Sequence, residues 1–224
     1  MVVACRAHAA EPHMSQPRAL QGRAPAGPSC ESGCMRLFAA VVPPDDVLDE
    51  LGRVVAELKG RGGAQRLRWT EAAGWHFTLA FYGEVDDDLV PELSRRLERV
   101  AGRSGAFPLA LRGGGQFGRG RALWVGAEGD LDALRLLADR AEAAARKAGV
   151  PMGEHRRYRP HLTVARGREA VDVRAYVDGL DAFVGRTWTV SDLVLVRSNL
   201  PVSGVPGEQP RYEVVGRWAL EAGG

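Results

Sequence analysis

Cysteine is scarce in this chain of 224 residues, and its absence narrows the chemistry available. The three cysteines are Cys5, Cys30 and Cys34, so the sequence from Met35 onward contains none. This excludes a disulfide framework, a thiol nucleophile and a cysteine-ligated metal from the main body of the chain. Cys30 and Cys34 also lack the second pair of ligands that a tetrahedral zinc site requires.

The sequence also lacks long hydrophobic runs and a strong charge of either sign. No apolar run approaches the roughly 20 residues that span a bilayer, so we expect a protein that is not embedded in a membrane. The formal net charge of +2 allows a phosphate-bearing partner without requiring one. With 45% hydrophobic and 26% charged residues, the composition is typical of a globular protein. We expect a cytoplasmic monomer.

Residues 1–34 differ in composition from the rest of the chain. They include the segment QPRALQGRAPAGPSCESG, which is rich in Pro, Gly and Ser and has no apolar periodicity. We therefore expect a disordered N-terminal extension followed by a folded domain over residues 35–224. The extension lacks the continuous apolar stretch of a signal peptide, and it only weakly resembles a transit peptide. A simpler account is that translation starts at Met35.

From Met35 the sequence alternates between short apolar strands and amphipathic helices. This order recurs in the second half and predicts an α+β fold of two pseudo-symmetric lobes, each an antiparallel sheet with helices, enclosing a central cleft. The predicted helices cover residues 44–59, 86–103, 130–148 and 171–180. The predicted strands cover residues 36–42, 67–70, 75–82, 107–111, 121–127, 161–166, 187–198 and 211–220.

Two of the predicted strands share a polar pattern, HFTL from position 76 and HLTV from position 161. Successive side chains in a strand face opposite sides, so His76 and Thr78 share one face, as do His161 and Thr163. The residues between them are apolar and suit the other, buried face. Buried polar groups cost free energy unless they are paired. Because one such strand lies in each half, we predict that the polar faces meet across the cleft.

Two histidines and two threonines facing one cleft suit phosphodiester chemistry. Imidazole titrates near neutral pH, so one ring can act as general acid and the other as general base. The hydroxyls can donate hydrogen bonds to a non-bridging phosphate oxygen. A single strand histidine is more often structural than catalytic, but the duplicated pattern is much more specific.

These motifs resemble the paired His-x-Thr-x motifs of the two-histidine (2H) phosphoesterases. The segments MRLFAAVVPPD, RALWVG, RYRPHLTVAR and LVLVRSNL also follow the order of the bacterial and archaeal RNA 2′,3′-cyclic phosphodiesterases, also called 2′-5′ RNA ligases. The resemblance runs from Met35 to about Leu220. It implies hydrolysis of 2′,3′-cyclic phosphate ends on tRNA-derived or other short RNA to 2′-phosphomonoesters, with reverse 2′-5′ ligation and without metal or other cofactor.

The resemblance also implies a role for each motif residue. His76 would be the proton donor to the leaving ribose oxygen, and His161 the proton acceptor that activates water. Thr78 and Thr163 would bind the phosphate. Arg166 matches the substrate-binding arginine of the family. Strict strand alternation, however, puts Arg166 on the face opposite to His161, so this role requires a strand end or a β-bulge between them.

Two further residues are candidate substrate contacts. Tyr158 stands where phenylalanine is usual in the family. Phe117 lies in GGGQFG, residues 113–118, which we interpret as a hairpin loop at the rim of the cleft. The segment fits the glycine pattern of dinucleotide-binding proteins, but a strand follows it where those proteins have a helix. Phe117 would stack on a base or anchor this loop in the interior.

Two alternative functions remain open from the sequence. One is a phosphodiesterase for a small cyclic nucleotide phosphate. The other is a non-catalytic module that binds RNA ends, against which the intact histidines and threonines argue. Incubation with an RNA that carries a cyclic end, in the presence of EDTA, separates these functions.

Overall fold

The computed structural model describes residues 33–155, 157–201 and 209–222. The expectation of a disordered extension over residues 1–34 falls almost entirely outside these residues and stays a prediction. Cys34, at the end of that segment, already belongs to the first strand and is exposed. No helix within the described residues is long and apolar enough to cross a membrane.

The elements alternate along the chain as the sequence predicts. The α-helices are α1 (Asp45–Lys59), α2 (Val90–Ala101), α3 (Leu131–Lys147) and α4 (Arg174–Asp181), and three short 3-10 helices cover Ala64–Arg66, Ala72–Gly74 and Asp87–Leu89. The strands are β1 (Cys34–Val41), β2 (Leu67–Trp69), β3 (Phe77–Asp86), β4 (Phe107–Phe117), β5 (Ala122–Gly129), β6 (Leu162–Gly167), β7 (Val184–Val190), β8 (Asp192–Asn199) and β9 (Arg211–Ala219).

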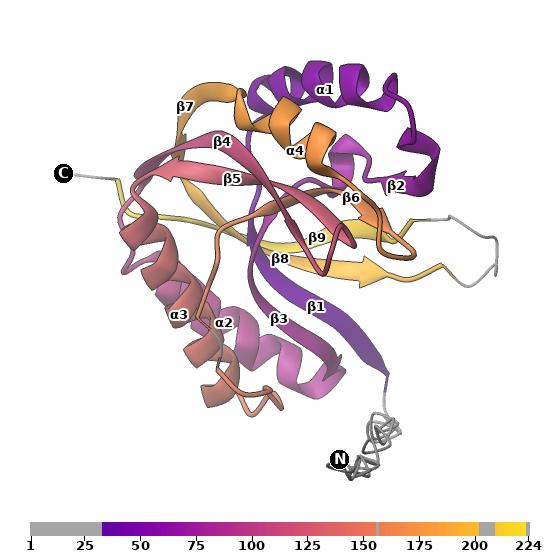
Figure 1. Ribbon diagram of the computed structural model, residues 1–224. Helices are drawn as coiled ribbons and strands as arrows, with labels where there is room; N and C mark the ends of the chain where they lie inside the picture. The colour runs from indigo at the N-terminus through magenta and orange to yellow at the C-terminus, as the bar shows by residue number, and fades with distance from the viewer. Residues whose placement is uncertain (1–32, 156, 202–208, 223–224) are drawn as a thin grey trace, which may run out of the picture. The chain divides into compact units, whose positions relative to one another are not determined.

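The strands form one antiparallel sheet in the order β7-β4-β5-β6-β3-β1-β8-β9, with β2 paired to β6 (Figure 1). This confirms the predicted α+β class. Two groups of strands meet where β6 pairs with β3, and the register there consists of a single pair, Phe77 opposite Leu162. We call β1, β3, β8 and β9 with their helices the first lobe, and β2, β4, β5, β6 and β7 with theirs the second lobe.

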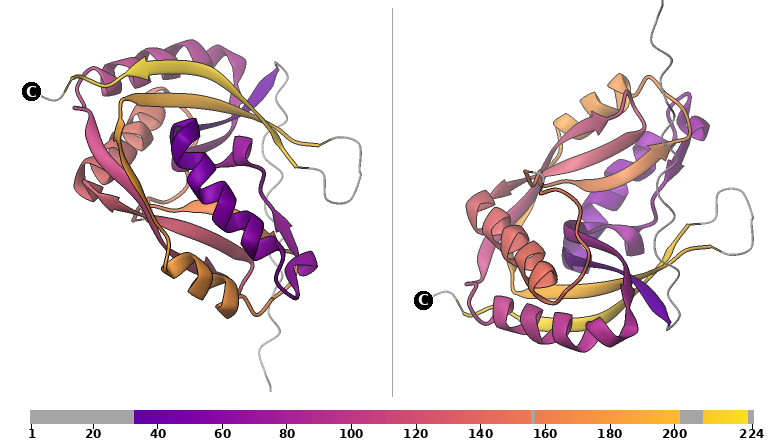
Figure 2. Two further views of the ribbon diagram at one scale, coloured as in Figure 1. Left: turned by 90° about the horizontal axis from the view of Figure 1, so that it is seen from above. Right: turned by 90° about the horizontal axis from the view of Figure 1, so that it is seen from below.

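The lobes exchange helices, so neither lobe is a continuous half of the chain. Helix α1 follows β1 of the first lobe but packs against β7 and α4 of the second lobe. Helix α3 follows β5 of the second lobe but packs against β3 and α2 of the first lobe. Figure 1 shows α1 and α4 at the top and α2 and α3 at the bottom. In both views of Figure 2, α2 runs along β9, which it contacts.

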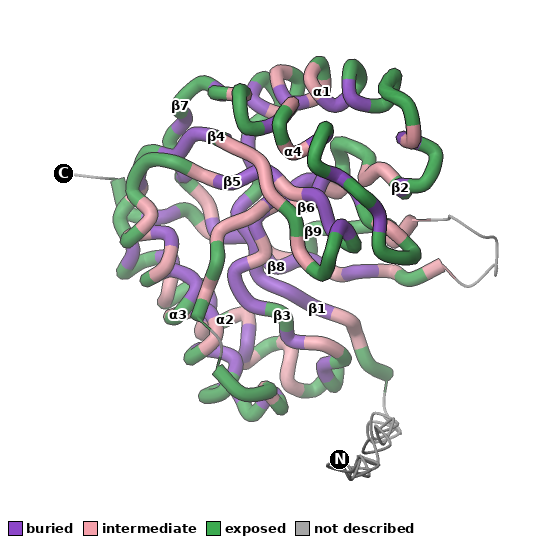
Figure 3. The backbone as a smooth tube through the Cα atoms, in the orientation of Figure 1, coloured by how far each residue is buried: buried purple, intermediate pink, exposed green. Residues whose placement is uncertain are grey.

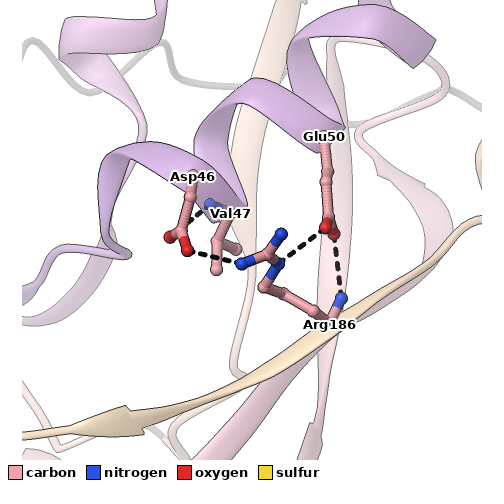
Figure 4. Close-up of polar contacts among 4 residues, drawn as sticks. All are labelled: Asp46, Val47, Glu50 and Arg186. Atoms are coloured by element: carbon pink, nitrogen blue, oxygen red, sulfur yellow. Dashed lines mark hydrogen bonds and ion pairs between the residues drawn. The ribbon is translucent and has the colours of Figure 1, made fainter.

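Helix α1 is fastened to the second lobe by ion pairs at Arg186 of β7 (Figure 4). The Arg186 guanidinium donates to Asp46 at 2.6 Å and to Glu50 at 2.7 Å, and its backbone N–H donates to Glu50 at 2.9 Å. These hydrogen bonds hold the pKa of the Glu50 carboxyl below its ordinary value. The Asp46 carboxylate also accepts a hydrogen bond from the backbone N–H of Val47, in the first turn of the helix, where the helix dipole is positive.

The core lies between the sheet and the helices. Figure 3 shows buried residues along most of β1 and alternating burial along the helices. In α1 the buried residues Val47, Leu51, Val55 and Leu58 follow helical spacing, which is why this amphipathic segment folds onto a sheet. Asp130 caps α3 as predicted, because its carboxylate accepts from the backbone N–H of Ala133 at 2.9 Å.

Two segments differ from the sequence prediction. The strand expected over residues 187–198 is two strands that separate at Ser191, because β7 pairs with β4 in one lobe and β8 pairs with β1 in the other. The loop expected over residues 113–118 is instead strand up to Phe117. Glycine allows the backbone of this segment to lie close to the side chains of β5, because a Cβ atom on Gly115 would overlap the Trp124 ring.

Candidate active site

The two His-x-Thr segments meet at the junction of the lobes. His76 and His161 immediately precede β3 and β6, whose first residues, Phe77 and Leu162, lie opposite each other. Extending this antiparallel register by one residue places His76 opposite Thr163 and Thr78 opposite His161. The histidines are thus brought together by neighbouring strands of one sheet.

The four polar residues share one face of that sheet. Phe77 and Leu162 are fully buried in the core, whereas His76, Thr78, His161 and Thr163 are all partly exposed. This alternation places the polar side chains opposite the helix-covered core. We call this side of the sheet the histidine face.

A β-bulge follows each threonine and resolves the difficulty with Arg166. In β6, Val164 is left out of register between Thr163 and Ala165 where the strand pairs with β5. A bulge reverses the alternation beyond it. Val164 and Ala165 are accordingly both buried, and Arg166 is exposed. The bulge therefore returns Arg166 to the histidine face, as its expected role requires.

The same irregularity occurs in β3. Leu79 is left out of register between Thr78 and Ala80 where β3 pairs with β1. The burial pattern from His76 to Phe81 repeats the pattern from His161 to Arg166, residue for residue. Phe81 therefore occupies in the first lobe the position that Arg166 occupies in the second.

Each histidine is held by aromatic rings of its own lobe. The His76 ring stacks on Phe38 of β1 with centroids 4.6 Å apart, and Tyr212 of β9 contacts it edge-on at 5.2 Å. The His161 ring meets Phe117 of β4 edge-on at 5.0 Å and Trp124 of β5 at 6.5 Å. These contacts fix the two imidazoles on rigid strands.

The surroundings of His76 disfavour its charged form. Burial, followed by the positive charge of Arg166, lowers the pKa of His76 from 6.5 to about 4, and His161 adds a smaller lowering. A hydrogen bond with the Gly74 backbone partly opposes this change.

The tautomer of neutral His161 follows from its hydrogen bond. Its Nδ1 lies 2.8 Å from the backbone carbonyl of Arg159. A carbonyl can only accept, so Nδ1 carries the proton and Nε2 is left as a lone-pair acceptor. An Nε2 lone pair on the histidine face is the form that a general base requires.

The other expected contacts differ in position. Phe117 contacts His161 at the end of β4, although the expected loop is strand, and its stacking on a base stays a prediction. Tyr158 packs against the hydrophobic core, and its buried hydroxyl has no hydrogen-bond partner among the described residues. Burial raises the pKa of this hydroxyl. A substrate contact of Tyr158 stays a prediction.

Sequence reasoning missed the aromatic residues Phe38, Trp124 and Tyr212. Aromatic residues in strands usually indicate core packing, so nothing marked these rings as site residues. Tyr212 also lines a hollow of about 500 Å³ between the segment that contains Glu71 and Gly74 and the start of β9.

The charge of Arg166 is expected to control the titration of His76. Replacing it, as in Arg166→Gln, removes a positive charge that disfavours the imidazolium, so the pKa of His76 should rise toward its ordinary value. NMR titration of the histidine ring resonances measures this rise. Arg53→Gln, an exposed site on α1, is the matched control and should leave the titration unchanged. An unaltered His76 titration in Arg166→Gln would contradict the placement of Arg166.

The amino-acid sequence matches a known protein family. The family model described as the 2′-5′ RNA ligase superfamily matches residues 43–200. The RNA 2′,3′-cyclic phosphodiesterase of Aeropyrum pernix is 34% identical over 155 residues, which are 66% of this chain and 85% of that protein.

Solved structures agree with this match. Apo LigT of Escherichia coli superposes with a TM-score of 0.65 at 26% identity, covering 85% of this chain and 99% of that chain. A Thermus thermophilus protein superposes with a TM-score of 0.66 at 28% identity, covering 85% of this chain and 100% of that chain. The resemblance noted in the motifs is confirmed, and the chain belongs to the 2′-5′ RNA ligase superfamily of two-histidine phosphoesterases.

Proposed function

We propose that this protein hydrolyses 2′,3′-cyclic phosphate ends of RNA to 2′-phosphomonoesters. The observation that carries this proposal is the antiparallel junction of β3 and β6, which gathers two histidines and two threonines on one face. The curated relatives named RNA 2′,3′-cyclic phosphodiesterase support the substrate class. LigT of E. coli has been crystallised with 3′-AMP and with phosphate, which also supports it.

The chemistry is an in-line displacement at phosphorus. His161, through its free Nε2, accepts a proton from a water molecule that attacks the phosphorus. The bond from phosphorus to the ribose 3′ oxygen breaks, and His76 protonates that oxygen as it leaves. The products are a 2′-phosphate and a 3′-hydroxyl. Thr78, Thr163 and Arg166 stabilise the charge on the non-bridging oxygens.

The lowered pKa of His76 is consistent with an acid that is charged on substrate binding. In the free protein, burial and the positive charge of Arg166 keep the ring neutral at pH 7. A bound phosphodiester brings a negative charge that offsets the charge of Arg166 and favours the imidazolium. The proton donor is therefore formed in the complex, where the reaction needs it.

Ligation would use the same groups in the same roles. A 2′-5′ phosphodiester forms when a 5′-hydroxyl of another RNA replaces water as the nucleophile: His161 accepts the proton of that hydroxyl, the bond from phosphorus to the 3′ oxygen breaks, and His76 protonates the leaving oxygen. A cytoplasmic location, a monomeric state and a tRNA-derived substrate stay predictions.

An RNA with a 2′,3′-cyclic end, incubated with the protein in EDTA, tests the proposal. We expect full turnover, because the proton transfers and the phosphate contacts come from side chains alone. Analysis of the product ends should give 2′-phosphate and 3′-hydroxyl. Loss of turnover in EDTA with recovery on adding a divalent ion would overturn the acid–base assignment. Binding without turnover would favour a non-catalytic RNA-end module.

A further inference from the structure

One exposed aromatic residue on the histidine face is not used by the proposed chemistry. Phe81 of β3 is 49% exposed, although the rest of the strand packs its large apolar side chains in the core. The bulge at Leu79 turns it outward. A ring displayed in this way contributes little to the packing of the fold.

Phe81 lies beside the aromatic surroundings of His76. Its partner in the β1 register is Phe38, the ring that stacks on His76. Both side chains therefore project from the histidine face on neighbouring strands. The rings of His76, Phe38 and Phe81 thus follow one another on this face of β1 and β3, with Phe38 buried and Phe81 exposed.

A guanidinium accompanies this ring. The central carbon of Arg36 lies 4.7 Å from the centroid of Phe81, as a cation–π pair. Arg36 also faces Glu84 at 3.4 Å, but both side chains of this ion pair are partly exposed and the pair holds Arg36 only weakly. The guanidinium is thus able to turn toward a phosphate.

We propose that Phe81 and Arg36 form a subsite for a nucleotide upstream of the cyclic end, with its base stacked on the ring and its phosphate contacted by the guanidinium. Single-stranded RNA is bound by such pairs, because every base offers a π face and every linkage a negative charge. The inference rests on the proposed function, and it specifies an RNA chain as substrate in preference to a small cyclic nucleotide.

The direction of the RNA follows from the two bulges. The equivalent position in the second lobe is Arg166, on the histidine face, whereas the first lobe offers Phe81. Phe81 lies five positions after His76, which is at most about 16 Å along a strand. Since a cyclic phosphate stands at the 3′ end of an RNA, a base at this distance belongs to an upstream nucleotide.

The test compares two substrates in the Phe81→Ala variant. For an oligonucleotide with a 2′,3′-cyclic end, we expect kcat/KM to fall about 10- to 100-fold through KM, with kcat unchanged. For a nucleoside 2′,3′-cyclic phosphate, which has no upstream base, both parameters should stay at the wild-type value. Phe81→Trp should restore the oligonucleotide KM, because the larger ring also stacks.

Leu136→Ala is the matched control, because Leu136 is also 49% exposed but lies on α3, outside the histidine face. Equal losses on both substrates, or the same loss in the control, would overturn the subsite. If the wild type turned over neither substrate, the proposed function would fail, and binding of a hydroxyl-ended oligouridylate would then decide the subsite. Unchanged affinity in Phe81→Ala would refute it.

The guanidinium has a separate readout. Arg36→Gln should weaken oligouridylate binding and reduce the slope of log affinity against log salt by about 0.7, the value for one lost phosphate contact on a single strand. Glu84→Gln removes the competing carboxylate and should leave binding equal or tighter. Arg53→Gln controls for the change in net charge and should leave the slope unaltered. A slope unchanged in Arg36→Gln would contradict the phosphate contact.

Discussion

Replacing either histidine with alanine is expected to lower kcat by about 10²- to 10⁴-fold, the usual contribution of a positioned proton-transfer group. Each of the variants His76→Ala and His161→Ala would lose one proton transfer and keep the contacts to the phosphate. Single-turnover measurement on an RNA with a cyclic end gives the rate of the chemical step. The double variant should be far less impaired than the product of the two single effects, because both groups act in one step.

Folding of these variants is the necessary control. Both rings lie on the histidine face, so the variants should keep the fold. His76→Ala should have the lower melting temperature of the two, because burial of its ring against Phe38 and Tyr212 is lost. The pH–rate profile provides a second check, since each variant should lose the limb that its imidazole produces. A variant that folds and keeps wild-type kcat would remove that histidine from the mechanism.

The stability of the protein is expected to fall by about 3 kcal/mol between pH 7 and pH 4 because of His76 alone. The ring has a pKa near 4 in the folded protein and an ordinary value of 6.5. Well above pH 6.5 the ring is neutral in both the folded and the unfolded state and contributes no pH dependence. As the pH falls from about 6.5 toward 4, the unfolded chain binds a proton that the folded protein does not, so unfolding is favoured.

Urea denaturation at several pH values measures this effect as a difference between wild type and His76→Gln. Carboxyl groups titrate in the same range, but they do so in both proteins and cancel from the difference. The variant should therefore lose less stability on acidification. Thr78→Val, which changes no titratable group on the same face, is the control and should keep the wild-type pH dependence. Parallel curves for wild type and His76→Gln would contradict the low pKa.

Much of the fold could be predicted from local patterns. Helices α1 and α3 follow from apolar spacing and from acidic residues at their N-termini. The polar face of β3 and β6 follows from strict alternation in HFTL and HLTV. Helical spacing and strand alternation are properties of short segments, and they are the same in the folded protein.

Features that depend on distant pairing could not be predicted. The bulges at Leu79 and Val164 exist because β3 and β6 must match the registers of β1 and β5, which no local pattern records. The break at Ser191 arises because its flanking strands belong to different lobes. Likewise, the sequence alone predicts a loop at Gly115. The reason for this glycine is the Trp124 ring of the neighbouring strand, which leaves no room for a Cβ atom.

The exchange of helices and strands between the lobes bears on how the chain folds during synthesis. Strand β1 emerges from the ribosome first, but its partner β8 is among the last elements made. The first lobe therefore stays open until the C-terminal strands arrive, and such long-range pairing slows folding. Tyr212, on β9, contacts His76. The last of the described strands thus completes the surroundings of a histidine that is translated much earlier.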